Sequence, residues 1–391
     1  MIDHSLKHRF IATVLALVAL VAVGEFTHVC GVERGVLAPS VQSYVDREEL
    51  AGAVMLVAGR DGVMDVEAVG WADIAAKKPM RTDSIFWIAS QSKPITAAAL
   101  MILVDEGKIS LDDPVEKYLP EFQGQMYVAE READRKVLRK PRHPITIRNV
   151  LSHTSGLPFK SAIEVPTLDL WPLSLRVRSY AATPLDFDPD TKYQYSNAGI
   201  NTAARVIEVV TGTSFEEFLD RRLLQPLGMK ETTFWPTNDQ AARVATAYKP
   251  GPKNQGLVAT QIEQLKYPLT DRTARSPMPA GGLFSTAEDL SRFYRMLLND
   301  GELDGRRVLS KAAVDELTKR QTPPELPESY GLGFSVGGTT FGHGGAYSTN
   351  SFADRQQGKI YVWLVQHAGF PGEGDKSQGA FLKVAKDAYS K

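Results

Sequence analysis

The sequence contains one Ser-x-x-Lys tetrapeptide, Ser90-Gln91-Ser92-Lys93, at the start of a segment with helical spacing of apolar residues from Pro94 to Glu106. Residues three apart share one face of a helix, so the Lys93 amine can reach the Ser90 hydroxyl. A serine hydroxyl is a weak nucleophile, and a lysine can serve as its base where burial or a nearby cation keeps the amine partly neutral. The helix N-terminus would also stabilise a developing oxyanion. The alternative is a helix-capping serine followed by a surface lysine.

A second candidate is Tyr195-Ser196-Asn197, the one Tyr-x-Asn in a chain with 13 tyrosines. A helical pattern runs from Ala198 to Thr211, which puts the tripeptide on a loop, where functional groups are often presented. A phenol can relay protons, and the Asn197 amide can accept a hydrogen bond from Lys93 while it donates to a substrate carbonyl. A packed tyrosine followed by a capping asparagine is the alternative.

The third candidate segment is Phe341-Gly342-His343-Gly344-Gly345, which we place on a strand that leads into Ala346. Glycines weaken a strand and mark places where a ligand or another backbone comes close. A substrate could lie along this strand, with the amides of Ser90 and Ala346 facing each other as an oxyanion hole. A structural role for His343 is the alternative.

The elements that must hold these groups follow from the periodicity of the apolar residues. Expected strands are residues 53–58 and 63–69, joined by a hairpin at 59–62, and residues 331–336, 339–341, 351–353 and 360–366. Expected helices are residues 37–47, 94–106, 147–153, 198–211 and 379–389. Two capping boxes, Ser214 with Glu217 and Ser285 with Glu288, predict the starts of two more helices.

This order of elements predicts an α/β (α+β) fold. We expect an antiparallel sheet built from both chain ends, residues 25–110 and 290–391, and flanked by helices. A mostly helical lobe, residues 111–289, would be inserted between them, with the site in the cleft. The charged stretch at residues 122–144 is typical of a solvated excursion.

The composition limits the partners of this chain. Its 391 residues carry 45 Lys and Arg against 46 Asp and Glu, a formal charge of -1. This balance produces no long-range positive potential that would attract nucleic acid or an anionic membrane, so neither is an expected partner. A single cysteine, Cys30, cannot form an intramolecular disulfide, and no Cys/His cluster has metal-ligand spacing. We therefore expect no metal and no other cofactor. No sequence pattern specifies an oligomeric state.

Residues 1–24 have the layout of a secretory signal peptide. Lys7, His8 and Arg9 precede an apolar run that ends in Ala22-Val23-Gly24. The run is shorter than the ~20 residues of a membrane span. We expect cleavage near Gly24, a secreted or periplasmic location and no membrane span afterwards. A retained N-terminal anchor is the alternative.

The three candidate segments together resemble the penicillin-recognising serine hydrolases: class C β-lactamases, D-Ala-D-Ala carboxypeptidases and family VIII carboxylesterases. The family's order is Ser-x-x-Lys, then Tyr-x-Asn, then a Lys-Thr-Gly-like triplet on a sheet-edge strand, and this chain follows it. The resemblance extends to residues 146–157, 226–229, 280–289 and 330–334, and it covers nearly all of the mature chain. It implies a β-lactamase/transpeptidase-like fold.

The resemblance also implies a role for each motif residue: Ser90 as the acylated nucleophile, Lys93 as its base, Tyr195 as general acid/base, Asn197 as orienting residue, Ser90 and Ala346 as the oxyanion hole, and His343, Gly344 and Gly345 as substrate-binding residues. The departure is His343-Gly344-Gly345 where many β-lactamases have Lys-Thr-Gly. A largely neutral histidine and a missing hydroxyl bind a carboxylate less well, which favours uncharged esters or amides.

Two other patterns are set aside. Gly333–Gly337 fits Gly-x-Ser-x-Gly, and Asp354 and His367 follow in the order of an α/β-hydrolase triad. A nucleophile elbow passes from strand into helix, however, whereas Ser335 precedes Gly337-Gly338 and more strand. His153, at a predicted helix end, fits a structural histidine that bonds local backbone.

The sequence therefore predicts a serine hydrolase that forms an acyl-enzyme on Ser90 and acts on short-chain esters or related small acyl substrates. Alternatives within the family are a β-lactamase, a D-Ala-D-Ala carboxypeptidase or a D-aminopeptidase, with β-lactam or amide substrates. A further alternative is a catalytically silent relative that binds peptidoglycan or a protein.

Overall fold

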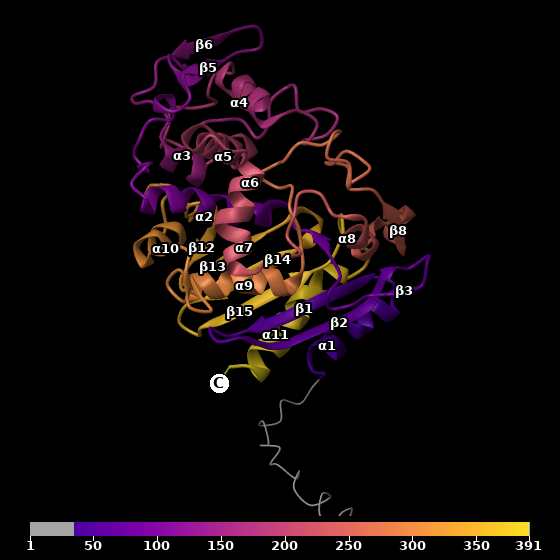
Figure 1. The fold of residues 1–391 in the computed structure, drawn as a ribbon. Coiled ribbons are helices and arrows are strands. Elements are labelled where there is room, and N and C mark those ends of the chain that lie inside the picture. The colour runs from indigo at the N-terminus through magenta and orange to yellow at the C-terminus, as the bar shows by residue number, and fades with distance from the viewer. Residues whose placement is uncertain (1–34, 391) are drawn as a thin grey trace, which may run out of the picture. The chain divides into compact units, whose positions relative to one another are not determined.

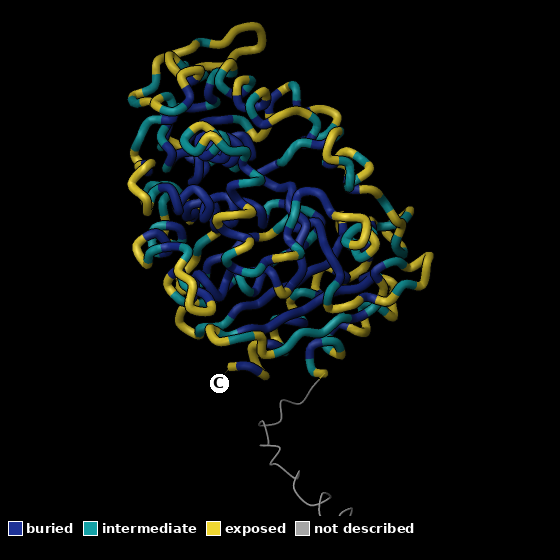
Figure 2. The backbone as a smooth tube through the Cα atoms, in the orientation of Figure 1, coloured by how far each residue is buried: buried dark blue, intermediate teal, exposed yellow. Residues whose placement is uncertain are grey.

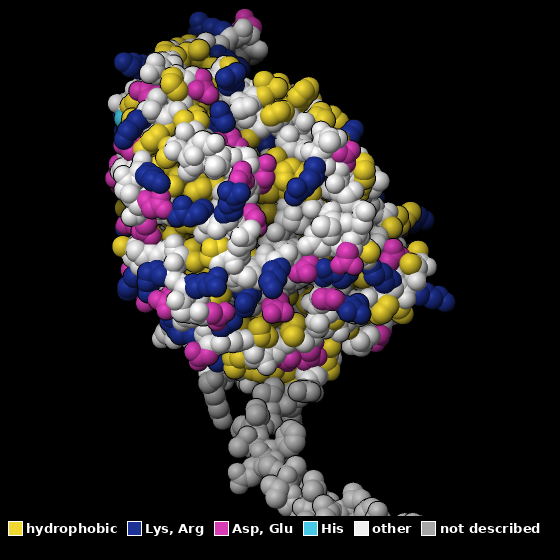
Figure 3. All heavy atoms as spheres, viewed as in Figure 1, with side chains coloured by type: hydrophobic (Ala, Val, Ile, Leu, Met, Phe, Trp, Pro, Cys, Tyr) yellow, Lys and Arg dark blue, Asp and Glu magenta, His cyan; other side chains and the backbone are white. Residues whose placement is uncertain are grey.

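The computed structural model describes residues 35–390. The predicted signal peptide, residues 1–24, and Cys30 lie outside the described residues, so the predicted secretory route stays a prediction. None of the helices between residues 35 and 390 combines the length and the apolar character that crossing a bilayer requires. On the face drawn in Figure 3, basic and acidic side chains are interspersed, as the balanced charge suggests.

Strands from both ends of the described chain form one seven-stranded sheet, in the order β12-β13-β14-β15-β1-β2-β3, with every neighbouring pair antiparallel (Figure 1). Its strands are β1 (Gly52–Ala58), β2 (Val63–Asp73), β3 (Lys78–Pro79), β12 (Ser335–Gly337), β13 (Thr340–Gly344), β14 (Asn350–Asp354) and β15 (Lys359–Leu364). The central pairing joins Val54 of β1 to Leu364 of β15. Residues far apart in the chain are thereby fixed side by side.

The central strand β1 is buried on both faces, and its side chains alternate between two cores. Val54, Leu56 and Ala58 belong to the core shared with α9 (Ala287–Leu298). Met55 and Val57 face the opposite core, which contains α1 (Leu37–Asp46) and α11 (Ser377–Ala388). Figure 1 shows α1 and α11 together on one side of the sheet and α9 on the other.

The remaining helices lie mostly above the α9 face of the sheet. They are α2 (Ser92–Asp105), α3 (Ile147–Ser152), α4 (Leu173–Ala181), α5 (Asn197–Thr211), α6 (Phe215–Leu219), α7 (Gln225–Leu227), α8 (Asn238–Arg243) and α10 (Lys311–Thr318). Four two-stranded pairs accompany them: β4 (Phe86–Trp87) with β9 (Phe284–Ser285), β5 (Tyr127–Arg131) with β6 (Lys136–Arg139), β7 (Ala247–Pro250) with β8 (Leu257–Thr260), and β10 (Glu302–Leu303) with β11 (Arg306–Arg307).

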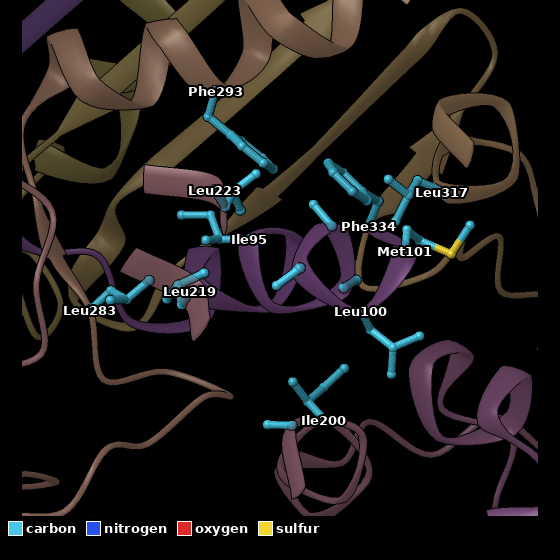
Figure 4. Packing of buried hydrophobic residues seen from close by; sticks show 14 of the residues in the cluster. Ile95, Leu100, Met101, Ile200, Leu219, Leu223, Leu283, Phe293, Leu317 and Phe334 are labelled. Atoms are coloured by element: carbon cyan, nitrogen blue, oxygen red, sulfur yellow. The ribbon is translucent and has the colours of Figure 1, made fainter. Parts of the chain in front are cut away.

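Helix α2 is apolar all round and almost wholly buried, as expected for a helix in the middle of a core. Leu100 of α2 and Ile200 of α5 point toward each other, and Phe293 of α9 lies on the opposite side of α2 (Figure 4). Pro94 is the third residue of α2, within the first turn, where its missing N–H breaks no helical hydrogen bond. The helix that carries Lys93 is therefore held rigidly from both sides.

The fold class predicted from the sequence is confirmed, since a large antiparallel sheet is flanked by helices. The predicted lobe boundaries near residues 110 and 290 stay a prediction. The charged stretch at residues 122–144 contains the β5–β6 hairpin, which is largely exposed at the top of Figure 2.

Several predicted boundaries were wrong. The capping residue of α9 is Thr286, whose hydroxyl accepts from the Asp289 N–H, rather than Ser285, because Ser285 pairs with Phe86 in the β4–β9 ladder. The strand expected from residue 331 begins only at Ser335, because Gly333 has a left-handed φ of 74°. Helix α2 starts at Ser92, two residues earlier than expected.

The burial of α2 predicts that Leu100→Ala destabilises the protein strongly. Leu100 is inaccessible to solvent, so truncating it leaves a cavity that costs about 2–5 kcal/mol. Leu138→Ala is the matched control, because Leu138 is 41% exposed and its loss should cost less than about 0.5 kcal/mol. Urea-induced unfolding measures both changes, and equal midpoints for the two variants would contradict the packing described for α2.

Candidate active site

Ser90 lies in a short 3₁₀ turn, Ala89–Gln91, between β4 and α2, and it is half-buried. The turn is held in place because the Ile88 N–H donates to the Leu283 carbonyl at 3.0 Å. Ala89 has a left-handed φ of 47°, a conformation that is uncommon for residues with a side chain. The first hydrogen bond of the turn runs from the Gln91 N–H to Ile88, so the Ser90 amide has no partner within the turn.

Lys93 follows one helical turn later, and its side chain is fully buried. Its Nζ lies 3.1 Å from Ser90 Oγ, 2.8 Å from Asn197 Oδ1 and 2.8 Å from the Ala280 carbonyl oxygen. Burial lowers the pKa of the Lys93 ammonium well below its ordinary value of 10.5. All three partners are neutral oxygens, so the site favours the uncharged amine next to the Ser90 hydroxyl.

The loop before α5 brings Tyr195 and Asn197 to this lysine. The Ser196 hydroxyl caps α5 by accepting from the Gly199 N–H, and the Phe159 carbonyl accepts from the Asn197 N–H at 3.1 Å. The Tyr195 ring centroid lies 4.6 Å from Lys93 Nζ, which places the phenol ring beside the amine. Burial raises the pKa of the Tyr195 phenol, which therefore keeps its proton at neutral pH.

Strand β13 runs along the other side of Ser90. A side chain on Gly345 would collide with the Ile88 carbonyl, so only glycine lets the strand end approach the turn that carries Ser90. Ala346 opens a second tight turn, Ala346–Ser348, in which Tyr347 has a left-handed φ of 64°, and the Ala346 amide has no partner inside that turn. Gly344 is exposed, and a Cβ at this position would make only an ordinary contact, 3.8 Å from the Thr349 carbonyl oxygen.

His343 is buried in β13, and both of its ring nitrogens have partners. Nδ1 donates to the Gly344 carbonyl at 2.5 Å, so Nε2 carries no proton and accepts from the Tyr330 hydroxyl at 2.9 Å. Burial lowers the pKa of the His343 imidazole to about 3, and a positive charge on Lys93 would lower it in the same direction. The ring is therefore neutral at pH 7, so it supplies no cation for a substrate carboxylate.

His153 was interpreted from the sequence as a structural histidine bonding local backbone. Its partner is instead 43 residues away in the sequence: Nδ1 accepts from the Ser196 N–H at 3.2 Å. The ring centroid lies 4.6 Å from that of Tyr195 and 4.7 Å from that of Tyr330. Burial lowers the pKa of His153 well below its ordinary value, so this ring is a neutral packing partner of Tyr195.

The structure thus brings together Ser90, Lys93, Tyr195, Asn197 and the strand from His343 to Ala346. Sequence reasoning missed the Ala280 carbonyl and the Tyr330 hydroxyl. Both residues lie in segments, 280–289 and 330–334, that resemble the penicillin-recognising serine hydrolases, but the resemblance alone assigns no contact to either residue. Within residues 35–390, no group of three His, Cys, Asp or Glu side chains is arranged to hold a metal ion.

The Gly-x-Ser-x-Gly residues do not assemble into a triad. Ser335 is an exposed residue of the short strand β12. Asp354 accepts from the N–H groups of the turn that follows it. His367 Nε2 accepts from the Ala51 N–H at 3.1 Å, so that imidazole is engaged with backbone in another part of the sheet.

Comparisons with known proteins agree with this geometry. The family model described as beta-lactamase matches residues 37–384. Penicillin-binding protein 4 of Amycolatopsis lactamdurans is 35% identical over 308 residues, which cover 78% of this chain and 69% of that protein. Esterase EstB of Burkholderia gladioli is 29% identical over 366 residues, covering 83% of this chain and 87% of the esterase.

A solved structure adds a match in three dimensions. The structure of EstCE1, described as a hydrolase with promiscuous acyltransferase activity, has a TM-score of 0.73 and 25% identity, and covers 91% of this chain and 98% of its own. The family model and the named relatives point to the same chemistry. The chain belongs to the beta-lactamase family, and within that family it is a serine hydrolase.

Proposed function

We propose that the protein is a carboxylesterase that hydrolyses short-chain esters or related small acyl substrates through an acyl-enzyme on Ser90. The observation that carries the proposal is the buried Lys93 amine, 3.1 Å from the Ser90 hydroxyl and surrounded by neutral oxygens. A serine nucleophile requires a neighbouring general base, and an uncharged amine can take that role. The relative Esterase EstB supports the choice of ester substrates.

In the proposed acylation step, a neutral Lys93 directs its two N–H groups to Asn197 Oδ1 and to the Ala280 carbonyl. Its lone pair is then left for the Ser90 hydroxyl. The hydroxyl proton moves to Nζ while Oγ attacks the ester carbonyl carbon, whose oxygen becomes an oxyanion. The Ser90 and Ala346 amides, which have no partner inside their own turns, would donate to that oxyanion.

The leaving alcohol needs a proton when the tetrahedral intermediate collapses. Tyr195 would give its phenol proton to the alkoxide and recover one from the Lys93 ammonium, so the amine is neutral again. Water then attacks the acyl-enzyme with the same groups acting in reverse, which releases the carboxylic acid and restores Ser90. The raised pKa of the Tyr195 phenol supports this role, because the proton is held until the alkoxide forms.

The preference for uncharged substrates rests on the strand beside Ser90. The neutral His343 and the side-chain-free Gly344 offer neither a cation nor a hydroxyl to a substrate carboxylate. Phe159 adds an apolar surface on the other side: it is 45% exposed, and its ring stacks on Tyr195 with the centroids 6.3 Å apart. An apolar group of the ester next to the proton donor would contact this ring.

The second candidate function is hydrolysis of β-lactams or of D-Ala-terminated peptides. It is favoured by the 35% identity to Penicillin-binding protein 4. The same acyl-enzyme chemistry would apply, because an ester, an amide and a β-lactam all present a carbonyl carbon to Ser90. The two candidates differ in the substrate carboxylate, which β-lactams and D-Ala peptides carry and simple esters lack.

Ser90→Ala is expected to lower kcat/KM for p-nitrophenyl butyrate by more than about 1000-fold, because nucleophile loss removes the covalent route. Ser335→Ala is the matched control and should keep the rate within about twofold, since surface changes away from the site have little effect. Intact-protein mass after treatment with a fluorophosphonate should show one adduct, absent only in Ser90→Ala. Equal labelling of Ser90→Ala and wild type would refute the proposed nucleophile.

Wild-type enzyme is expected to turn over p-nitrophenyl butyrate faster than nitrocefin, which carries a carboxylate. The double variant His343→Lys/Gly344→Thr introduces an amine and a hydroxyl at this strand, where a bound substrate carboxylate would hold the amine in its charged form. It should raise the nitrocefin-to-ester ratio of kcat/KM by about tenfold, as one added charge-assisted hydrogen bond would. Gly344→Thr alone controls for the change of shape. Nitrocefin turnover exceeding ester turnover in the wild type would instead favour the second candidate function.

A further inference from the structure

The Ala280 carbonyl is one of the two oxygens that fix the Lys93 amine, yet Ala280 belongs to neither a helix nor a strand. The position of its carbonyl therefore depends on contacts made by the surrounding segment. Thr96 of α2 donates from its hydroxyl to the Pro279 carbonyl at 2.8 Å, which supports the segment from one side. The Ala280 N–H donates to Asn201 Oδ1 at 3.1 Å, which supports it from the other side.

Asn201 is one helical turn after Asn197 on α5, so the two amides lie on one face of the helix. Asn197 contacts Lys93 Nζ directly, and Asn201 holds the residue whose carbonyl contacts the same atom. Both side chains are buried, and Asn201 is fully so. One face of α5 thus supplies Asn197 Oδ1 and also positions the Ala280 carbonyl, the two oxygens that accept the N–H groups of a neutral Lys93.

The orientation of the Asn201 amide is set by the groups behind it. The Glu164 carboxylate can only accept, so the Tyr180 hydroxyl must donate to it, over 2.7 Å. The Tyr180 oxygen then accepts from Asn201 Nδ2 at 3.0 Å, which leaves Oδ1 facing the Ala280 N–H. Each link in this chain has one possible donor and one possible acceptor.

The far end of the chain is anchored in the loop before α4. Glu164 is 1% exposed, and its second oxygen accepts from the Ser161 N–H at 2.8 Å. The fully buried guanidinium of Arg176 lies 3.9 Å from the carboxylate. Arg176 also donates to the Pro277 carbonyl, three residues before Ala280. Two routes therefore connect the loop that carries Glu164 to the segment around Ala280. One runs through Tyr180 and Asn201, and the other runs through Arg176.

We propose that Asn201, Tyr180 and Glu164 are positioning residues for the esterase reaction: they hold the Ala280 carbonyl against Lys93 Nζ and so fix the direction in which the amine faces Ser90. The inference rests on the proposed function of Lys93. None of the three residues contacts Ser90, and each acts through Ala280.

Breaking the hydrogen bonds that link Glu164, Tyr180 and Asn201 to Ala280 is expected to change the pKa of Lys93. An oxygen acceptor stabilises an ammonium more than an amine, so a displaced Ala280 carbonyl lowers the apparent pKa of Lys93 further. The other titratable groups facing Lys93 are Ser90, Tyr195, His153 and His343. The phenol keeps its proton because its pKa is raised, and both imidazoles stay neutral near pH 7 because their pKa values are lowered, so none of these groups titrates there.

The test compares pH profiles of kcat/KM for p-nitrophenyl butyrate. Asn201→Leu should lower kcat/KM by about 10- to 100-fold, as misplacement of a catalytic group does, and should move the acid limb to lower pH by about half a unit. Tyr180→Phe, a milder change that keeps the ring, should lower kcat/KM by about threefold and shift the limb in the same direction. Thr202→Val is the matched control, because that buried hydroxyl bonds only to Ala198 of its own helix.

The profile separates positioning from a merely structural role. If Asn201→Leu and Tyr180→Phe lose activity while the acid limb stays in place or moves to higher pH, the inference is wrong. The same holds if both variants behave like Thr202→Val. Thermal unfolding checks that each variant is folded. If Asn201→Leu does not fold, the pH profile of Tyr180→Phe alone decides between the two roles. Retained activity in Ser90→Ala within the same series would instead overturn the proposed function itself.

Discussion

The site depends on one constraint, the burial of an amine without an opposite charge. Lys93 Nζ is surrounded by three neutral oxygens, and burial alone accounts for the lowered pKa of its ammonium. A carboxylate in place of any of these oxygens would hold the lysine as a permanent cation, which cannot take a proton. The neutral acceptors satisfy the N–H groups at the centre of the core. Under the proposed function they also leave the amine free to act as the base for Ser90.

The fold meets this constraint by bringing distant parts of the chain to one helix. The turn before α2 presents Ser90 and the first turn of α2 presents Lys93. The loop before α5 adds Tyr195, and Ala280 closes the site from a segment without regular structure. Strand β13 completes it, because the chain ends share one sheet and Gly345 allows close approach. The three oxygens around Lys93 Nζ come from three different segments of the chain. The ionisation of Lys93 therefore depends on how these segments pack together.

Part of this arrangement could be predicted from the sequence because it follows local rules. Ser90 and Lys93 are three residues apart at a helix start, so their spacing predicts that they lie close together. The grouping of Asn197 with them followed from the resemblance to penicillin-recognising serine hydrolases. Apolar, β-branched segments near both chain ends predicted a sheet built from both ends, and the sheet is present. Boundaries failed where two neighbouring residues compete for one role, as when Thr286 rather than Ser285 caps α9.

The rest could not be predicted, because its chemistry leaves no pattern in the sequence. A backbone carbonyl such as that of Ala280 exists at every residue, and only the fold selects one. The chain from Glu164 through Tyr180 to Asn201 joins residues of three elements by single hydrogen bonds. His153 likewise bonds the backbone of Ser196, far along the chain. Such contacts depend on tertiary structure, which periodicity does not encode.

The pH dependence of Ser90 acylation tests the central claim most directly. Under the proposed function, single-turnover rates with a neutral chromogenic ester, measured from about pH 5 to 11, should follow the fraction of Lys93 in its uncharged form. A buried amine without a countercharge predicts a rate that rises and levels off at an apparent pKa well below the ordinary 10.5 of lysine. A rate that still rises steeply through about pH 10 would show that Lys93 titrates as an ordinary lysine, and would contradict the account.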